Sequence, residues 1–251
     1  MKKLTALIIT AILLICLVGC IRQDVVLDET KNYEITSEIH SLDVEINAAD
    51  FKILSADEFS VESNLKYLSV SEKDGVLKIV DEAKSNGNYS NAILTLYVPN
   101  GMVFDDVDIE TGAAKMTVDT LSSSSVELKL GAGDVRFDYL NASSEVDIEG
   151  GAGAITIVSG TLNNLKLEMG MGKLNLTSAV LGDSDLEFGV GEYNVTLIGS
   201  REDYEVDIEK GLGNITVDGK IVTDFGSSGN GQNHIEIDGG VGAINLNFKE
   251  N

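Results

Sequence analysis

The chain has 251 residues, of which 18 are basic and 41 acidic, so its formal net charge is −23. An apolar fraction of 43% excludes wholesale disorder, and the length allows one large domain or two small ones. The acidic balance excludes nucleic acid as a partner, because phosphate binding needs clustered Lys and Arg. Two cysteines cannot form a disulfide framework, and two histidines leave little material for metal or acid–base chemistry.

The first 20 residues, MKKLTALIITAILLICLVGC, have the pattern of an export signal. Lys2 and Lys3 give a positive start, and an apolar run of signal-peptide length follows, shorter than the ~20 residues of a membrane span. The run ends in Leu-Val-Gly-Cys20, which resembles a bacterial lipobox. The resemblance implies a signal peptide over residues 1–19 and a lipid on Cys20. The mature protein would then be exported and anchored to the outer side of the cell membrane. An ordinary signal peptide or an uncleaved anchor is the alternative.

The body of the chain is a repeat built around a short glycine turn. Seven segments align on this turn, of which VDIEGGAGAITIV at residues 146–158 is typical, and their leading glycines are 19 to 29 residues apart. A weaker copy begins at Leu42 and has Asn47 in place of the glycine. Because Gly and Asn best tolerate the left-handed conformation, we expect positive φ at Asn47 and at leading glycines such as Gly151 and Gly170. The turn glycines of the GxG copies are Gly131, Gly133, Gly151, Gly153, Gly170, Gly172, Gly189, Gly191, Gly211, Gly213, Gly240 and Gly242.

Apolar residues alternate with polar ones on both sides of each turn, which indicates strand, turn, strand. A unit of about 20 residues cannot bury its apolar side alone, so the copies must stack to share a core. We therefore predict an all-β, single-domain parallel β-solenoid over residues 100–251, with an antiparallel β-sandwich as the alternative. Residues 20–34 form a tether to the lipid. Residues 35–99 form an N-terminal β cap or insertion, in which Asp74-Gly75 is a hairpin signal.

Three features together resemble a known family: a strand ending in YVP at residues 97–99, the segment VDIETGA at 107–113, and the GxG-bearing strand pairs that follow. They are similar to the bacterial putative-adhesin family of β-helical cell-envelope proteins, over roughly residues 38–248. The resemblance implies an envelope location and a non-catalytic, adhesin-like scaffold or binding surface that meets an envelope protein or surface ligand. A regulatory or sensory envelope-stress protein acting through a membrane partner is the alternative.

Two outward columns of side chains precede the turns, four and two residues before each leading glycine, and twelve of their fourteen positions are acidic. In a stacked repeat, each carboxylate would lie about 4.8 Å from the next. The first explanation of such a face is a solvated surface that keeps the repeat soluble. The alternative is a surface for Ca²⁺ or Mg²⁺, or for a basic partner. The candidate face consists of Asp147, Glu149, Glu168, Asp185, Glu187, Asp207 and Glu209.

No metal site is firmly predicted from these columns, and calcium would be the only cofactor. A tight Ca²⁺ site needs six or more converging oxygens, and a flat ladder supplies fewer. The calcium-binding nonapeptide repeat needs Asp two residues after its last glycine, where this chain has Ile155.

Catalytic residues are not predicted. No serine sits in a G-x-S-x-G elbow, no Walker lysine follows the glycines, and polar groups are spread along ladders rather than gathered in one pocket. A further column, after the turns, could bind carbohydrate or ice, or simply form stabilising ladders. It consists of Thr117, Arg136, Thr156, Asn175, Asn194, Thr216 and Asn245.

Overall fold

A computed structural model describes residues 26–84, 87–209, 211–222 and 228–250. Within these ranges the chain is made of β-strands and turns, with one short 3-10 helix, η1 (Arg201–Asp203). The described part of the chain holds no helix with the length and apolar character needed to cross a membrane. The predicted signal peptide and Cys20 lie outside the described residues.

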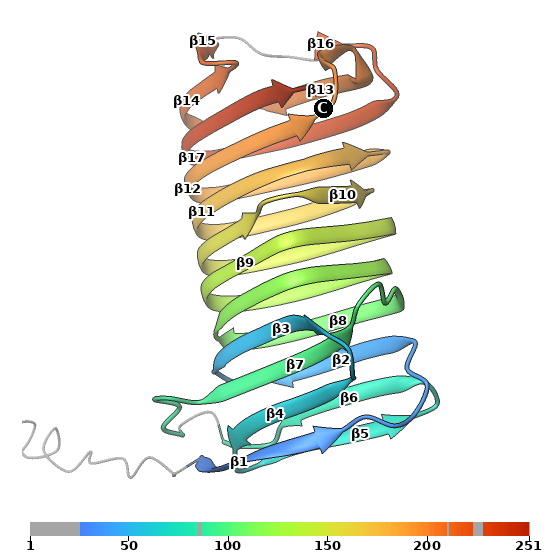
Figure 1. The fold of residues 1–251 in the computed structure, drawn as a ribbon. Helices are drawn as coiled ribbons and strands as arrows, with labels where there is room; N and C mark the ends of the chain where they lie inside the picture. The colour runs from blue at the N-terminus through green and yellow to red at the C-terminus, as the bar shows by residue number, and fades with distance from the viewer. Residues whose placement is uncertain (1–25, 85–86, 210, 223–227, 251) are drawn as a thin grey trace, which may run out of the picture.

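The strands wind into one tall stack of coils that forms a single sheet (Figure 1). Each coil runs along one side of the stack, bends at the glycine turn and returns along the other side. In the middle coils, β9 (Lys115–Ile157) continues through two glycine bends, and β11 (Leu165–Leu181), β12 (Asp183–Ile198) and β17 (Asn233–Lys249) each continue through one. β8 (Phe104–Ala113) ends at its bend, and the short strand β10 (Gly160–Asn163) pairs with β9 and β11.

The repeats pair in parallel and in register. Gly172 of β11 lies opposite Gly153 of β9 on one side and opposite Gly191 of β12 on the other. In turn, Gly191 lies opposite Gly242 of β17. The expected all-β fold with a largely parallel sheet is therefore confirmed. Because neighbouring copies pair in parallel, the antiparallel sandwich is wrong.

The order of the coils departs from the order of the chain near the C-terminus. Strands β13 (Tyr204–Glu209) and β14 (Leu212–Val217) precede β17 in sequence, yet they form the coil beyond it. The C-terminal strand β17 is thus inserted between β12 and β13–β14 and pairs in parallel with both neighbours. The last coil of the chain is therefore an inner coil of the stack.

A similar inversion occurs at the other end. Strands β2 (Ser41–Ile46) and β3 (Asp50–Ala56) form the coil next to β8 and β9. Strands β6 (Val76–Asp81) and β7 (Ile93–Pro99) come later in sequence but form the coil on the far side of β2 and β3, again in parallel. Part of the segment expected as a cap thus continues the parallel stack.

Antiparallel strands cover both ends of the stack. β4 (Ser60–Leu65) and β5 (Leu68–Lys73) pair with β7 and β6, and β1 (Leu27–Glu34) pairs with β4. The expected tether over residues 20–34 is therefore wrong for Leu27–Glu34, which is a strand of the fold. At the other end, β15 (Lys220–Val222) and β16 (Ser228–Gly229) pair with β14 and β13. Antiparallel cover of this kind limits further parallel pairing at an edge. The Asp74-Gly75 hairpin is confirmed, with φ of 54° and 79° joining β5 to β6.

The core is built from columns of aliphatic side chains. Leu167 lies opposite Ile148 and Leu186, and Leu186 lies opposite Ile237. All four are at most 1% exposed. Burial of such a side chain contributes about 1.5–3 kcal/mol as an upper estimate, so each coil gains its stability from the coils above and below it.

Candidate functional site: a carboxylate-lined groove

The glycine bend holds its two glycines for different reasons. The second glycine has positive φ in every GxG copy except at Gly191, for example +135° at Gly153 and +139° at Gly172. The leading glycines Gly151 and Gly170 do not, so the expectation of positive φ there is wrong. They are required because successive coils approach closely: a Cβ added to Gly170 would lie 2.6 Å from the carbonyl oxygen of Gly151. All twelve predicted turn glycines in the described coils lie at this bend.

The asparagine at position 47 is also there because of its contacts and not because of its backbone conformation, since φ is not positive at this residue. Its amide nitrogen Nδ2 donates to the backbone oxygens of Asp81 and Ala83, at 3.2 and 3.1 Å, and to the Asp81 carboxylate at 3.0 Å. Asn47 therefore ties its coil to the coil below, where the other copies have only a glycine.

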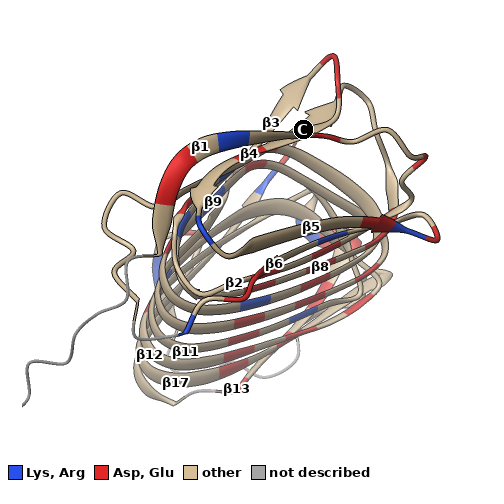
Figure 2. Cartoon of the chain, turned by 90° about the horizontal axis from the view of Figure 1, so that it is seen from below, with Lys and Arg blue, Asp and Glu red and all other residues tan. Residues whose placement is uncertain are grey.

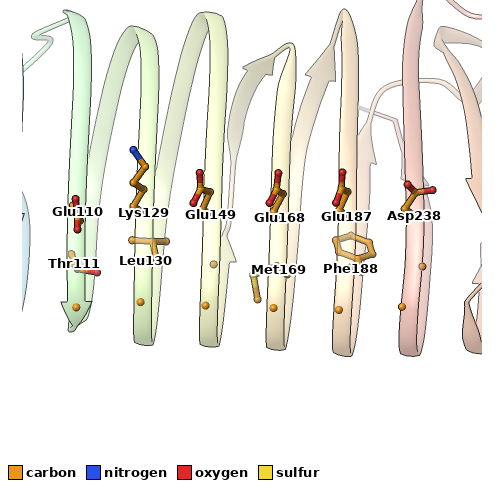
Figure 3. A pocket seen from close by; sticks show the side chains of 18 residues that line it. Glu110, Thr111, Lys129, Leu130, Glu149, Glu168, Met169, Glu187, Phe188 and Asp238 are labelled. Atoms are coloured by element: carbon orange, nitrogen blue, oxygen red, sulfur yellow. The ribbon is translucent and has the colours of Figure 1, made fainter.

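The bend leaves a groove on the outside of the stack. Its volume is about 790 Å³, and it crosses six coils. Figure 3 shows one wall, where Glu110, Lys129, Glu149, Glu168, Glu187 and Asp238 project side by side from successive coils. The leading glycines of the same coils, such as Gly151 and Gly170, form its floor. Because these glycines lack side chains, the groove is continuous from coil to coil.

The carboxylates of this wall form a column set by strand register. Glu168 lies opposite Glu149 and Glu187, and Asp238 lies opposite Glu187 and Glu209. Seen along the stack, acidic residues recur at the same place in successive coils (Figure 2). The predicted column is present, but Asp238 stands between Glu187 and Glu209 because β17 is inserted there.

The neighbouring outer column holds the other predicted acidic residues. Asp147 and Asp185 both lie opposite Lys166, and Asp207 lies opposite Glu236. Asp108, between Asp43 and Glu127 in this column, has a raised carboxyl pKa, caused first by partial burial and then by the neighbouring carboxylates. Like charges therefore face one another along this column.

Three lysines offset part of this repulsion. Lys129 pairs with Glu127 of its own strand, and Lys166 pairs with Glu168 at 2.8 Å. At the N-terminal end, Lys78 contacts Asp43 at 2.6 Å and Glu45 at 2.7 Å. Hydrogen bonds to these carboxylates raise the pKa of each ammonium group. The stretch from Glu149 to Glu209 keeps an unbroken row of carboxylates.

A metal centre is not formed by these rows. In the ranges that the structure describes, no three His, Cys, Asp or Glu side chains are grouped closely enough to hold one ion. A ladder offers each cation the carboxylates of adjacent coils, short of the six to eight oxygens that Ca²⁺ takes.

A row of apolar side chains next to the groove was not anticipated from the sequence. It occupies the middle position of the GxG turns, where Met171 is 60% exposed and Leu212 is 76% exposed. The signal was present, because alanine at the earlier turns gives way to larger residues at the later ones. We call this the apolar row; it consists of Met171, Val190, Val241 and Leu212.

The predicted column after the turns, which is rich in Thr and Asn, forms a hydrogen-bonded ladder. Asn194 Nδ2 donates to Asn175 Oδ1 at 3.1 Å, and Asn245 Nδ2 donates to Asn194 Oδ1 at 2.9 Å. The ladder continues at both ends, with Asn175 donating to Thr156 and Thr216 donating to Asn245. Because these amides satisfy one another between coils, a stabilising role accounts for this column.

The architecture and the site define an all-β repeat protein whose chemistry is arranged in rows along an extended surface. The chain belongs to the Toastrack DUF4097 family, whose model matches residues 31–247. This confirms the family expected from the sequence.

Comparison with solved structures gives low similarity over nearly the whole chain. A putative adhesin from Parabacteroides merdae is 12% identical, with a TM-score of 0.40 and 89% of this chain and 94% of that chain covered. A putative lipid binding protein from Parabacteroides distasonis is 14% identical, with a TM-score of 0.40 and coverage of 87% and 96%. A putative cell adhesion protein from Clostridium sporogenes is 17% identical, with a TM-score of 0.34 and coverage of 88% and 99%. No curated protein sequence matches this chain.

Proposed function

We propose that this chain is a non-catalytic lipoprotein of the bacterial cell envelope that binds a partner through the carboxylate-lined groove. Its parallel β-solenoid would serve as an adhesin-like scaffold, held by Cys20 at the outer side of the cell membrane. The observation that carries this proposal is the groove itself, which crosses six coils and presents its charges in a row. Catalysis needs a few groups that converge on one point, whereas a long repetitive surface suits an extended partner.

The membrane part of the proposal rests on the N-terminal sequence. Lys2 and Lys3, the apolar run and Gly19-Cys20 occur in the order that export and lipidation require. Two acyl chains on Cys20 would give stable anchoring, where one chain alone is marginal. Replacing Cys20 by Ala should release the protein from the membrane fraction or leave the precursor unprocessed. If the Cys20→Ala protein fractionates and migrates like the parent, the lipid anchor is wrong.

The binding part is tested by chemical cross-linking on intact cells, followed by capture of this chain. We expect a cross-linked partner that disappears when Glu149, Glu168 and Glu187 are replaced by Gln. A matched control replaces Glu58 and Glu145 by Gln and Asp74 by Asn, three exposed carboxylates away from the groove. Both variants change the net charge by the same amount. Equal partner yield from the two variants would show that the groove is not the binding surface.

A further inference from the structure

The apolar row runs along the border of the groove. Met171 directly follows Gly170, Val190 follows Gly189 and Val241 follows Gly240, and each of these glycines lines the groove. Strand register places the row in adjacent coils, in the order Met171, Val190, Val241, Leu212. A carboxylate wall, a glycine floor and an apolar row therefore lie side by side along the stack.

The exposure of the apolar row is concentrated rather than scattered. In the part of the chain that the structure describes, nine large apolar side chains are exposed, and four of them stand in this row. Isolated exposed apolar residues are normal on a protein surface, whereas a contiguous set rimmed by polar groups marks an interaction site. We therefore expect the apolar row to be covered by a binding partner that places apolar side chains against it.

We infer that the occupant is a basic amphipathic α-helix that lies along the stack axis, in the groove and over the apolar row. This inference rests on the proposed function and specifies the partner's chemistry. Two residues before the floor glycines, Glu149, Glu168, Glu187 and Asp238 present carboxylates from four successive coils. Lys or Arg on one face of the helix would meet these carboxylates, and apolar residues on the adjacent face would meet Met171 and its neighbours.

Backbone hydrogen bonding favours a helix over an extended segment. The coils pair on both sides of the leading glycines, with Met169 opposite Phe188 and Met171 opposite Val190, while Gly170 and Gly189 themselves are not register partners. A strand lying along the stack axis would cross these coils rather than run alongside one, so it could not form a β-ladder with them. A helix satisfies its own N–H and C=O groups and needs no such ladder.

The spacing of the carboxylates along the stack also agrees with the spacing of residues along an α-helix. Adjacent coils are separated by about 4.8 Å, so the four carboxylates from Glu149 to Asp238 span about 14 Å. Three helical turns span about 16 Å, so four basic residues one turn apart would meet them nearly one to one. Flexible Lys stems absorb a difference of about 2 Å. Alternate residues of a strand are about 6.7 Å apart, so a strand would match fewer of the four.

The test uses two synthetic 18-residue peptides of identical Lys and Leu composition. In one, the helical order places Lys on one face and Leu on the adjacent face; in the other, the same residues are permuted to destroy this segregation. Binding to the full chain is measured by calorimetry in 0.15 M NaCl, and helix formation by circular dichroism at 222 nm. The described part of this protein contains only one short 3-10 helix and contributes little helical signal of its own.

We expect the segregated peptide to bind and become helical, and the permuted peptide to bind at least about tenfold more weakly. Replacing Met171 by Gln with Val190 and Val241 by Thr should weaken binding about tenfold. The Glu149→Gln, Glu168→Gln, Glu187→Gln variant should do the same, while the Glu58, Asp74 and Glu145 control should not. Equal binding of both peptides, or no effect of the apolar-row variant, would overturn the helix inference and leave the groove as a general polycation surface. Binding of neither peptide would also overturn it, while the cross-linking experiment decides on the groove separately.

Discussion

At the scale of single residues, the glycine bend shows what a periodic sequence can and cannot specify. The repeat predicted that glycine is needed at both GxG positions, but it could not separate the two reasons. Positive φ at the second glycine is a local property of the chain. The need for the leading glycine comes from the next coil, whose carbonyl oxygen occupies the space a Cβ would take. That contact exists only once the coils are stacked.

The two reasons can be measured separately with three Gly→Ala variants. Gly101 has φ +76° and open space around it, so Gly101→Ala should cost only the backbone strain, about 1 kcal/mol. At Gly170 φ is not positive, but the neighbouring coil leaves no room for a Cβ, so Gly170→Ala should lower the free energy of unfolding by the cost of overpacking, about 1–3 kcal/mol. Gly172 has both, so Gly172→Ala should lower the free energy of unfolding most, by about 3 kcal/mol. Chemical denaturation midpoints give the order, and a Gly172→Ala midpoint equal to that of Gly101→Ala would contradict it.

At the scale of strands, the sequence predicted the elements well and their spatial order only in part. The alternation of apolar and polar residues, the Asp74-Gly75 hairpin and the outward columns all follow from local patterns. The insertion of β17 between β12 and β13–β14 does not. Every copy presents nearly the same edge and the same aliphatic columns, so alternative orders of coils bury similar surface. The segments that connect the strands determine which order of coils forms, and the lengths of these segments alone do not show which coil each of them leads to.

Engineered disulfides test the position of β17 directly. Asn194 and Asn245 are register partners, so cysteines at these positions should form a disulfide. A stack in chain order would instead pair Asn194 with Thr216, which here lies two coils away, about 9.6 Å, beyond the reach of a disulfide. With Cys16 and Cys20 replaced by Ser, we expect oxidation to cross-link the Asn194→Cys, Asn245→Cys variant and to leave the Asn194→Cys, Thr216→Cys variant reduced. The reverse result, measured by gel mobility and thiol titration, would restore the chain-order stack.

At the scale of the whole molecule, much of the net charge of −23 lies in the carboxylate columns. These columns form an extended acidic surface, and the repulsion between their charges lowers the stability of the stack. The sequence identified the carboxylate columns, because every copy carries them at fixed distances from the turn. It did not show the groove, since the groove depends on how the bend curves and on the space left by the glycines. The apolar row was missed for a related reason: Met171 and Val190 occupy turn positions, where exposure cannot be inferred from strand alternation.

Repulsion along the carboxylate columns should make the stability of the whole stack depend on salt. Carboxylates two or more coils apart, at about 9.6 Å and beyond, lie within the screening length of about 30 Å at 0.01 M ionic strength but outside that of about 8 Å at 0.15 M, so added salt removes their mutual repulsion. We therefore expect the thermal midpoint to rise by about 2–4 °C between 0.01 and 0.15 M NaCl, the shift that about 1 kcal/mol produces in a chain of this size. The Glu149→Gln, Glu168→Gln, Glu187→Gln variant should have a higher midpoint than the parent at low salt and a smaller dependence on NaCl.

Adding 2 mM CaCl₂ in 0.15 M NaCl should change neither midpoint further, because adjacent coils offer too few oxygens to hold Ca²⁺ tightly. A calcium-dependent rise in the parent at that salt concentration, absent from the variant, would instead show that the columns bind the cation specifically.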